Sequence, residues 1–274
     1  MSSQAIEFVL RRDRAVIVAA LVVITGLAWA YVAWLVSDMA MGGMDMTGYR
    51  MIPSGMGLMM PESAPWQPIE FILMFVMWAV MMIGMMTPSV APMVLLYARV
   101  GRQAMTQGKP FASSNWFFGG YLLAWMAFAL VATLAQWVVQ RASLLTPTME
   151  SANAIFGGTV LIAAGLYQWT PLKHACLRQC QAPLQFIQRH GGFRRDAKGS
   201  LGLGFRHGAY CVGCCWALMA LLFVGGVMNL LWIAALSVFV LLEKIIPAGR
   251  AFARVAGGVL VAGGGWLLAA ALIS

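Results

Sequence analysis

The chain has 274 residues, of which 61% are hydrophobic and only 10% are charged. This composition excludes an ordinary soluble globular protein and is typical of a polytopic membrane protein. The net charge of +9 would point to nucleic acid in a soluble protein, but the basic residues fall between apolar segments, so we expect no nucleic-acid partner.

Seven apolar segments are long enough to be membrane spans, each of which needs about 20 residues. They cover residues 15–36, 68–98, 114–140, 152–169, 208–226, 229–246 and 252–273. The first is too long for the apolar part of a cleavable signal peptide and lacks a small-residue cleavage site, so we interpret it as an uncleaved span. The predicted fold class is therefore all-α: a single polytopic transmembrane helix bundle of about seven spans.

The Lys and Arg residues are distributed unequally between the two predicted sides. Sixteen of the 18 lie at the N-terminus or in the second, fourth and sixth connections, which leaves Arg50 and Arg141 for the other side. Because basic residues concentrate on the cytoplasmic side, we expect a cytoplasmic N-terminus and an outer C-terminus. The predicted location is the inner (cytoplasmic) membrane of a bacterium, with the lipid bilayer as a partner.

The connection between the first two spans, residues 37–67, is predicted to be a Met-rich outer loop. Thioethers are soft ligands suited to Cu(I). The alternative is a loop that rests on the membrane surface and uses methionine as a flexible apolar residue. The candidate ligands in this loop are Met39, Met41, Met44 and Met46.

The second span continues the methionine pattern along one helical face before reaching Pro88. Proline removes a backbone hydrogen bond and kinks a helix, which leaves carbonyl groups free near clustered thioethers. Such an arrangement can form an ion site inside a membrane, although packing is an equally good explanation of the stripe. The candidate ligands here are Met77, Met81, Met82, Met85 and Met86.

All the cysteines lie in two short segments of the chain. They are Cys176, Cys180, Cys211, Cys214 and Cys215. On a helix, cysteines three or four residues apart share a face, so each group would present its sulfur atoms together. Two facing helix ends could bring four or five thiolates to one point, as Cu(I) or Zn(II) requires. The alternative for each cysteine is a buried packing role.

His207 lies four residues before Cys211 and is a further candidate ligand. His174 lies two residues before Cys176, and this offset directs it to another face of a regular helix. The predicted orientation places the cysteines on the cytoplasmic side, where disulfides rarely persist. The following connection, residues 181–206, is predicted to be a flexible basic cytoplasmic loop.

Acidic residues are nearly absent from the predicted spans. Glu70 starts the second span and is expected in the headgroup region. Glu243 stands beside Lys244 at the end of the sixth span, where the two residues are either functional or a simple interfacial anchor.

Together these residues resemble a bacterial family of predicted metal-binding integral membrane proteins, classed as a domain of unknown function. The resemblance rests on four motifs: Met81-Met82-x-x-Met85-Met86-Thr87-Pro88-Ser89, Pro171-Leu172-Lys173-x-x-Cys176-Leu177-x-x-Cys180, Gly208-x-Tyr210-Cys211-x-Gly213-Cys214-Cys215-Trp216, and Glu243-Lys244. It covers most of the chain from the second span to the sixth. The resemblance implies metal binding and assigns no reaction.

Three functions fit this sequence. The favoured one is Cu(I) binding and transfer, or transport, between the outer methionines and the cytoplasmic cysteines, with a membrane or periplasmic protein as a possible partner. A second is a copper- or thiol-dependent membrane oxidoreductase, or a subunit of one, using Cys211 and Cys214. The chain shows no paired carboxylates, catalytic triad or nucleotide motif that would support this enzyme. A third is a scaffold with a structural zinc site.

Overall fold

Helices account for nearly all of the regular structure. The computed structural model describes residues 3–39, 49–61, 64–108, 111–146, 149–246 and 249–273, with side chains from residue 14 onward. The helices are α1 (Ser3–Met39), α2 (Pro68–Thr106), α3 (Ser114–Arg141), α4 (Ala154–Tyr167), α5 (Pro171–Gln181), α6 (Pro183–Arg189), α7 (Ala197–Ala220), α8 (Leu222–Gly225), α9 (Leu230–Ile245) and α10 (Gly249–Ile273). Two short strands, β1 (Tyr49–Met51) and β2 (Met59–Pro61), pair as an antiparallel hairpin. For the described residues the all-α prediction is confirmed.

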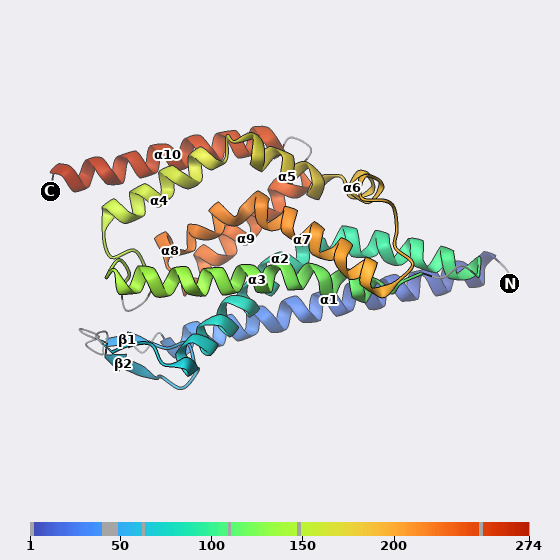
Figure 1. The fold of residues 1–274 in the computed structure, drawn as a ribbon, viewed down its shortest axis with the longest axis horizontal. Helices are drawn as coiled ribbons and strands as arrows, with labels where there is room; N and C mark the ends of the chain where they lie inside the picture. Colours follow the sequence, from blue (N-terminus) through green and yellow to red (C-terminus); the bar gives the residue numbers. More distant parts are fainter. Residues whose placement is uncertain are drawn as a thin grey trace.

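The principal helices run alternately from one end of the molecule to the other (Figure 1). α1 leads from the N-terminal end to the end that carries the hairpin, and α2 returns along it. The alternation continues through α3, α4, α7, α9 and α10. Between α8 and α9 the chain turns at Gly226, whose φ of +95° is readily adopted only by glycine.

Among the described residues, five helices are long and apolar enough to cross a membrane by length and composition. They comprise Arg14–Met39, Pro68–Thr106, Ser114–Arg141, Ala197–Gly225 and Gly249–Ile273. α4 has 14 residues and α9 has 16. At 1.5 Å per residue these two helices are about 21 and 24 Å long, shorter than a hydrocarbon core of about 30 Å. The count of seven spans therefore stays a prediction.

The segment that the sequence predicts as a flexible loop, residues 181–206, contains α6 and the first turns of α7. Asp196 caps α7, since its carboxylate accepts a hydrogen bond of 2.7 Å from the backbone N–H of Gly199. One glycine of this segment allows close packing of α7 on α3, because a Cβ on Gly204 would collide with the backbone carbonyl of Phe117. Glycine here serves helix contact, where the sequence had suggested flexibility.

The hairpin is fastened to the start of α2 by a buried ion pair. Nη2 of Arg50 lies 2.8 Å from Oε2 of Glu70, and both side chains are almost completely buried. The same guanidinium donates to the carbonyl groups of Pro61 and Ala64 at 2.9 and 2.8 Å. Glu70 is therefore not exposed to headgroup water, because its carboxylate is paired with Arg50 inside the protein, and its depth in the membrane stays a prediction.

Candidate metal centre

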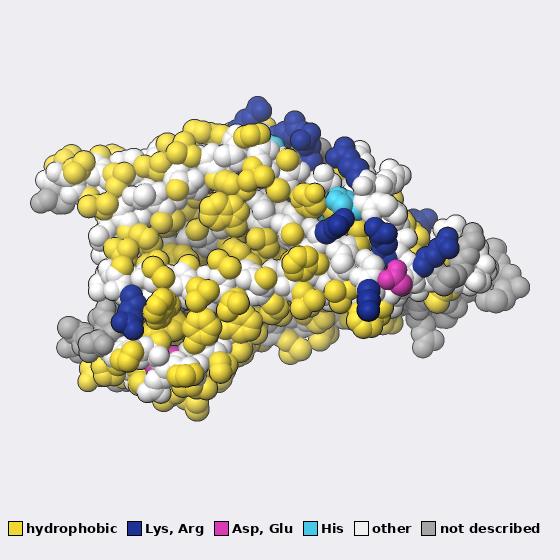
Figure 2. All heavy atoms as spheres, viewed as in Figure 1, with side chains coloured by type: hydrophobic (Ala, Val, Ile, Leu, Met, Phe, Trp, Pro, Cys, Tyr) yellow, Lys and Arg dark blue, Asp and Glu magenta, His cyan; other side chains and the backbone are white. Residues whose placement is uncertain are grey.

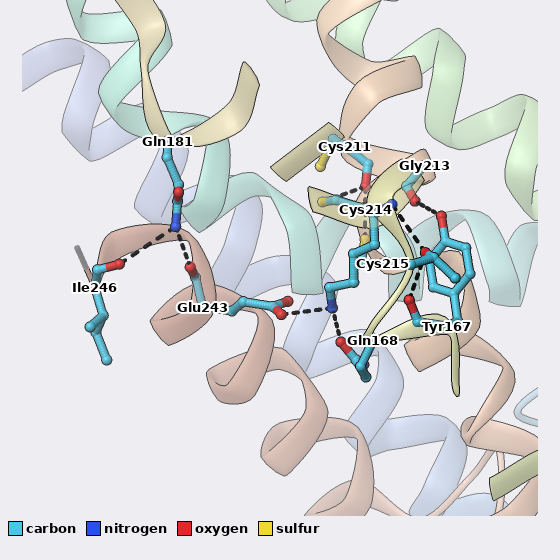
Figure 3. Close-up of polar contacts among 11 residues, drawn as sticks. Tyr167, Gln168, Gln181, Cys211, Gly213, Cys214, Cys215, Glu243 and Ile246 are labelled. Carbon is cyan, nitrogen blue, oxygen red and sulfur yellow. Dashed lines mark hydrogen bonds and ion pairs between the residues drawn. The ribbon is translucent and has the colours of Figure 1, made fainter. Parts of the chain in front are cut away.

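α5 is held against α9 by a buried ion pair. Thr170 caps α5 by accepting a hydrogen bond from the backbone N–H of Lys173, and Pro171 occupies the first helical position. Nζ of Lys173 lies 2.6 Å from Oε1 of Glu243, and both side chains are fully buried. In Figure 3, Glu243 and Gln168 converge on this ammonium group. This pair fixes where the first cysteine group lies.

The second cysteine group lies on the inward face of α7, as its spacing predicts. Cys211, Cys214 and Cys215 are each 1% exposed or less. The thiol groups of Cys214 and Cys215 donate to the backbone carbonyl of Cys211 at 3.0 and 2.9 Å. Both thiols are therefore hydrogen-bonded to the backbone of their own helix, beside Cys211.

The sulfur atom of Cys211 is the point where four helices meet. It accepts a hydrogen bond of 2.8 Å from Nζ of Lys244 on α9 and lies 3.1 Å from the hydroxyl of Tyr121 on α3. The same ammonium donates to the hydroxyl of Ser89 on α2 at 3.1 Å. An ammonium group in contact with sulfur favours the thiolate, the form of cysteine that binds metals.

The two cysteines of α5 lie beside those of α7. Cys176 packs on Gly213, where an added Cβ would lie 2.9 Å from the Cys176 sulfur. Burial, and then the neighbouring thiol of Cys214, raises the pKa of Cys176. Hydrogen bonding to Cys211 and then to Cys214 raises the pKa of the Cys180 thiol. All five cysteines are free thiols. The contacts of Cys176 and Cys180 with α7 bring the sulfur atoms of the two helices into one region.

This region is not a preformed coordination site. Across the described ranges, no group of three or more His, Cys, Asp or Glu side chains is arranged to hold a metal ion. Two thiols donate to a carbonyl, and Lys244 occupies one side of the Cys211 sulfur. A soft metal fits the donor set, but it would have to displace these hydrogen bonds. The assignment of the cysteines as ligands stays a prediction.

His207 lies close to the cysteine region, and its Nδ1 has no hydrogen-bond partner among the residues that the structure describes. Its side chain is 4% exposed, and its ring lies 4.9 Å from that of Phe186 and 6.0 Å from that of Tyr121, centroid to centroid. A buried ring nitrogen without a partner is costly, and a ligand would satisfy it. Within the described part of the chain, Nδ1 of His174 also has no hydrogen-bond partner, and burial and then Arg254 lower the pKa of its ring.

The candidate methionine ligands of α2 face the protein interior. Met77, Met81, Met82, Met85 and Met86 are each 2% exposed or less. In the first connection, Met39 ends α1 and is 8% exposed, whereas Met41, Met44 and Met46 lie outside the described residues. Burial is compatible with both ligation and packing, so the role of each methionine stays a prediction.

A family model described as PpoB2, copper chaperone, matches residues 75–267. This match covers more than half of the chain and includes every cysteine. The chain belongs to the PpoB2 copper chaperone family. No curated protein and no solved structure matches it. Membership of the PpoB2 family agrees with copper as the metal and with the predicted metal-related resemblance.

The matched PpoB2 region also contains buried charged residues whose role the sequence did not reveal. Lys173 and Lys244 were counted as basic residues on the cytoplasmic side, but they are 0% and 8% exposed. Glu243 and Lys244 do not anchor the helix end as a simple interfacial pair, because the first binds α5 and the second binds α7. Adjacent side chains on a helix point about 100° apart. This geometry is the one feature of the sequence that indicates different partners for Glu243 and Lys244.

Proposed function

We propose that this chain is a membrane-embedded copper chaperone that holds Cu(I) on the Cys211 sulfur. Cys214, Cys215 and the thiols of α5 complete the ligand set, with His207 as a further ligand. The single observation that carries this proposal is the Lys244 ammonium, 2.8 Å from the Cys211 sulfur in a buried site. This buried position already holds one positive charge against the Cys211 sulfur.

Charge balance favours Cu(I) over Zn(II) at this position. A Cu(I) ion that takes the place of the Lys244 ammonium at the Cys211 sulfur brings one positive charge, and the loss of one proton from a second thiol ligand leaves the net charge of the site unchanged. Because Ser89 already binds the same ammonium at 3.1 Å, Lys244 keeps a partner when it moves away from sulfur. A divalent ion would add a second charge to a buried region, where unbalanced charge is expensive. Thiolates are also the ligands that Cu(I) prefers.

The charge distribution supports a membrane location with a cytoplasmic N-terminus. Figure 2 shows Lys and Arg side chains gathered mainly at the end where α5, α6 and the start of α7 lie, with a broad hydrophobic surface between the two ends. Basic residues concentrate on the cytoplasmic side of membrane proteins. We propose seven passes through the bacterial inner membrane, in which α4 and α9 are short spans, and a cytoplasmic cysteine region.

The methionine face of α2 leads to the cysteine region. The backbone carbonyl of Met86 accepts a hydrogen bond of 3.2 Å from the Tyr121 hydroxyl, which also contacts the Cys211 sulfur. From Met77 to Met86 the face extends for about 14 Å along the helix axis. We propose that Cu(I) moves along these thioethers between the outer side and Cys211.

Anaerobic titration of the purified full chain with Cu(I), against a coloured Cu(I) chelator, tests the proposal. The wild type should hold Cu(I) tightly, and Cys211→Ser should weaken binding by at least about tenfold, since one tight ligand is lost. Met93→Leu, which alters a buried residue of α2 beyond Met86, serves as the control. Retention of zinc without copper would replace the proposal with a structural zinc site. Thiol redox turnover without metal would replace it with an oxidoreductase.

A further inference from the structure

Two methionine sulfur atoms at the hairpin end of the molecule contact the same buried side-chain amide group. Nε2 of Gln136 on α3 donates to the thioether sulfur atoms of Met149 and Met74 at 3.1 and 3.5 Å. All three side chains are 1% exposed or less. Met149 belongs to the connection between α3 and α4, so the contact joins two segments that share no helical periodicity with each other.

The orientation of the Gln136 amide is fixed by a third residue. Its Oε1 accepts a hydrogen bond of 2.6 Å from Nε1 of Trp78, one turn along α2 from Met74. With the oxygen engaged, the amino group is left to face the two thioethers. Thioether sulfur is a weak acceptor with a second lone pair, so each sulfur can still bind a soft ion.

The backbone at Met149 is held in an unusual conformation. Its φ is +63°, a left-handed value that costs free energy for a residue with a side chain. The backbone is tied on both sides, because its N–H donates to Thr146 at 2.9 Å and its carbonyl accepts from Val227 at 3.2 Å. Glycine or asparagine would adopt this conformation at lower cost. The conformation places a methionine, fully buried, beside Gln136 and Met74.

We propose that Met74 and Met149 form a second Cu(I) site, the entry or exit point for copper on the outer side. This inference rests on the proposed function, since it supplies that function with its outer ligands. Met77 follows Met74 on the same helical face. Met86, beside the Tyr121–Cys211 contact, lies about 18 Å from Met74 along the helix axis. Uncharged thioethers bind Cu(I) more weakly than thiolates do, which suits a site that must release the ion.

The test uses the full chain in detergent with all five cysteines replaced by serine, so that the thioether site is observed without thiol ligands. Anaerobic titration with Cu(I) should reveal one remaining site of weaker affinity. Adding Met149→Leu should lower its affinity by at least about tenfold, because leucine keeps the volume but not the sulfur. Adding Met93→Leu instead, which removes a buried methionine near the other end of α2, should leave it unchanged.

A second measurement identifies the ligands directly. The same cysteine-free variant, grown with selenomethionine and loaded with Cu(I), should show copper–selenium scattering in X-ray absorption, and Met149→Leu should reduce it. Equal Cu(I) affinity with and without Met149→Leu would overturn this inference while leaving the cysteine proposal intact. A wild-type chain that binds no Cu(I) at all would overturn both.

Discussion

Lys244 donates a hydrogen bond of 2.8 Å to the sulfur atom of Cys211 in the interior of the bundle. The lysine comes from α9 and the cysteine from α7, which lie together although the residues are 33 positions apart in sequence. This contact joins a buried cation to the central member of the cysteine region. In our account Lys244 marks the position that Cu(I) takes.

Replacing Lys244 with glutamine should make the stability of the folded protein depend more strongly on bound copper. The metal-free variant loses the counter-ion of a buried thiolate, and breaking a buried ion pair costs about 3–5 kcal/mol. Cu(I) restores the positive charge, so the copper-induced rise in melting temperature should be larger than in the wild type. Lys198→Gln, at an exposed position, is the control. If copper raised the melting temperature of Lys244→Gln and of the wild type equally, Lys244 and Cu(I) would not compete for Cys211.

Replacing Gly213 with alanine should weaken Cu(I) binding without removing a ligand. The added Cβ would lie 2.9 Å from the sulfur of Cys176, so this sulfur must shift away from its position beside α7. We expect a loss of about tenfold in Cu(I) affinity, as for other changes that displace a ligand. Gly202→Ala on the same helix meets no atom within 4 Å and should bind as the wild type does. A Gly213→Ala protein with unchanged affinity would show that Cys176 lies outside the ligand set.

Cu(I) affinity should rise with pH across the neutral range. Burial and the Cys214 thiol raise the pKa of Cys176, and hydrogen bonding to Cys211 raises the pKa of Cys180. Both thiols therefore carry protons at neutral pH, and the metal must displace them. Each proton released makes affinity rise by about tenfold per pH unit, which titration at several pH values measures. In the double variant Cys176→Ser, Cys180→Ser the slope should fall, and an unchanged slope would contradict this assignment.

Replacing Arg50 with glutamine should loosen the hairpin from α2. The change leaves the buried carboxylate of Glu70 without its cation and removes the anchor on the hairpin carbonyls, at a cost of about 3–5 kcal/mol. A nonspecific protease should then cut within residues 49–61 faster than in the wild type. The exposed Arg141→Gln variant should be cut at the wild-type rate. If Arg50→Gln is cut no faster, the ion pair does not hold the hairpin.

Much of this fold could be predicted because apolar segments and helix periodicity are local properties of a sequence. The spacing of Cys211, Cys214 and Cys215 was enough to predict a shared inward face, and the structure has it. The ends of α4 and α9 lie within two residues of the predicted segments, whereas α7 begins at Ala197 and not near residue 208, because an apolar run does not show where a polar cap such as Asp196 begins a helix.

The electrostatic part of the cysteine region could not be predicted in this way. Lys173 and Lys244 stand at the ends of apolar segments, where basic residues usually lie at the membrane surface. Only the packing of α5 and α7 against α9 shows that both lysines turn inward. Likewise, Met149 lies in a connection without periodicity, so its contact with Gln136 appears only in three dimensions.

The most direct test of the central claim is copper X-ray absorption on the full chain loaded with one equivalent of Cu(I) under anaerobic conditions. Our account predicts a first shell dominated by sulfur in the wild type. In Cys211→Ser this shell should lose a sulfur, and the copper should be held less tightly. A spectrum dominated by nitrogen or oxygen and unchanged by Cys211→Ser would contradict the claim that Cys211 holds the metal.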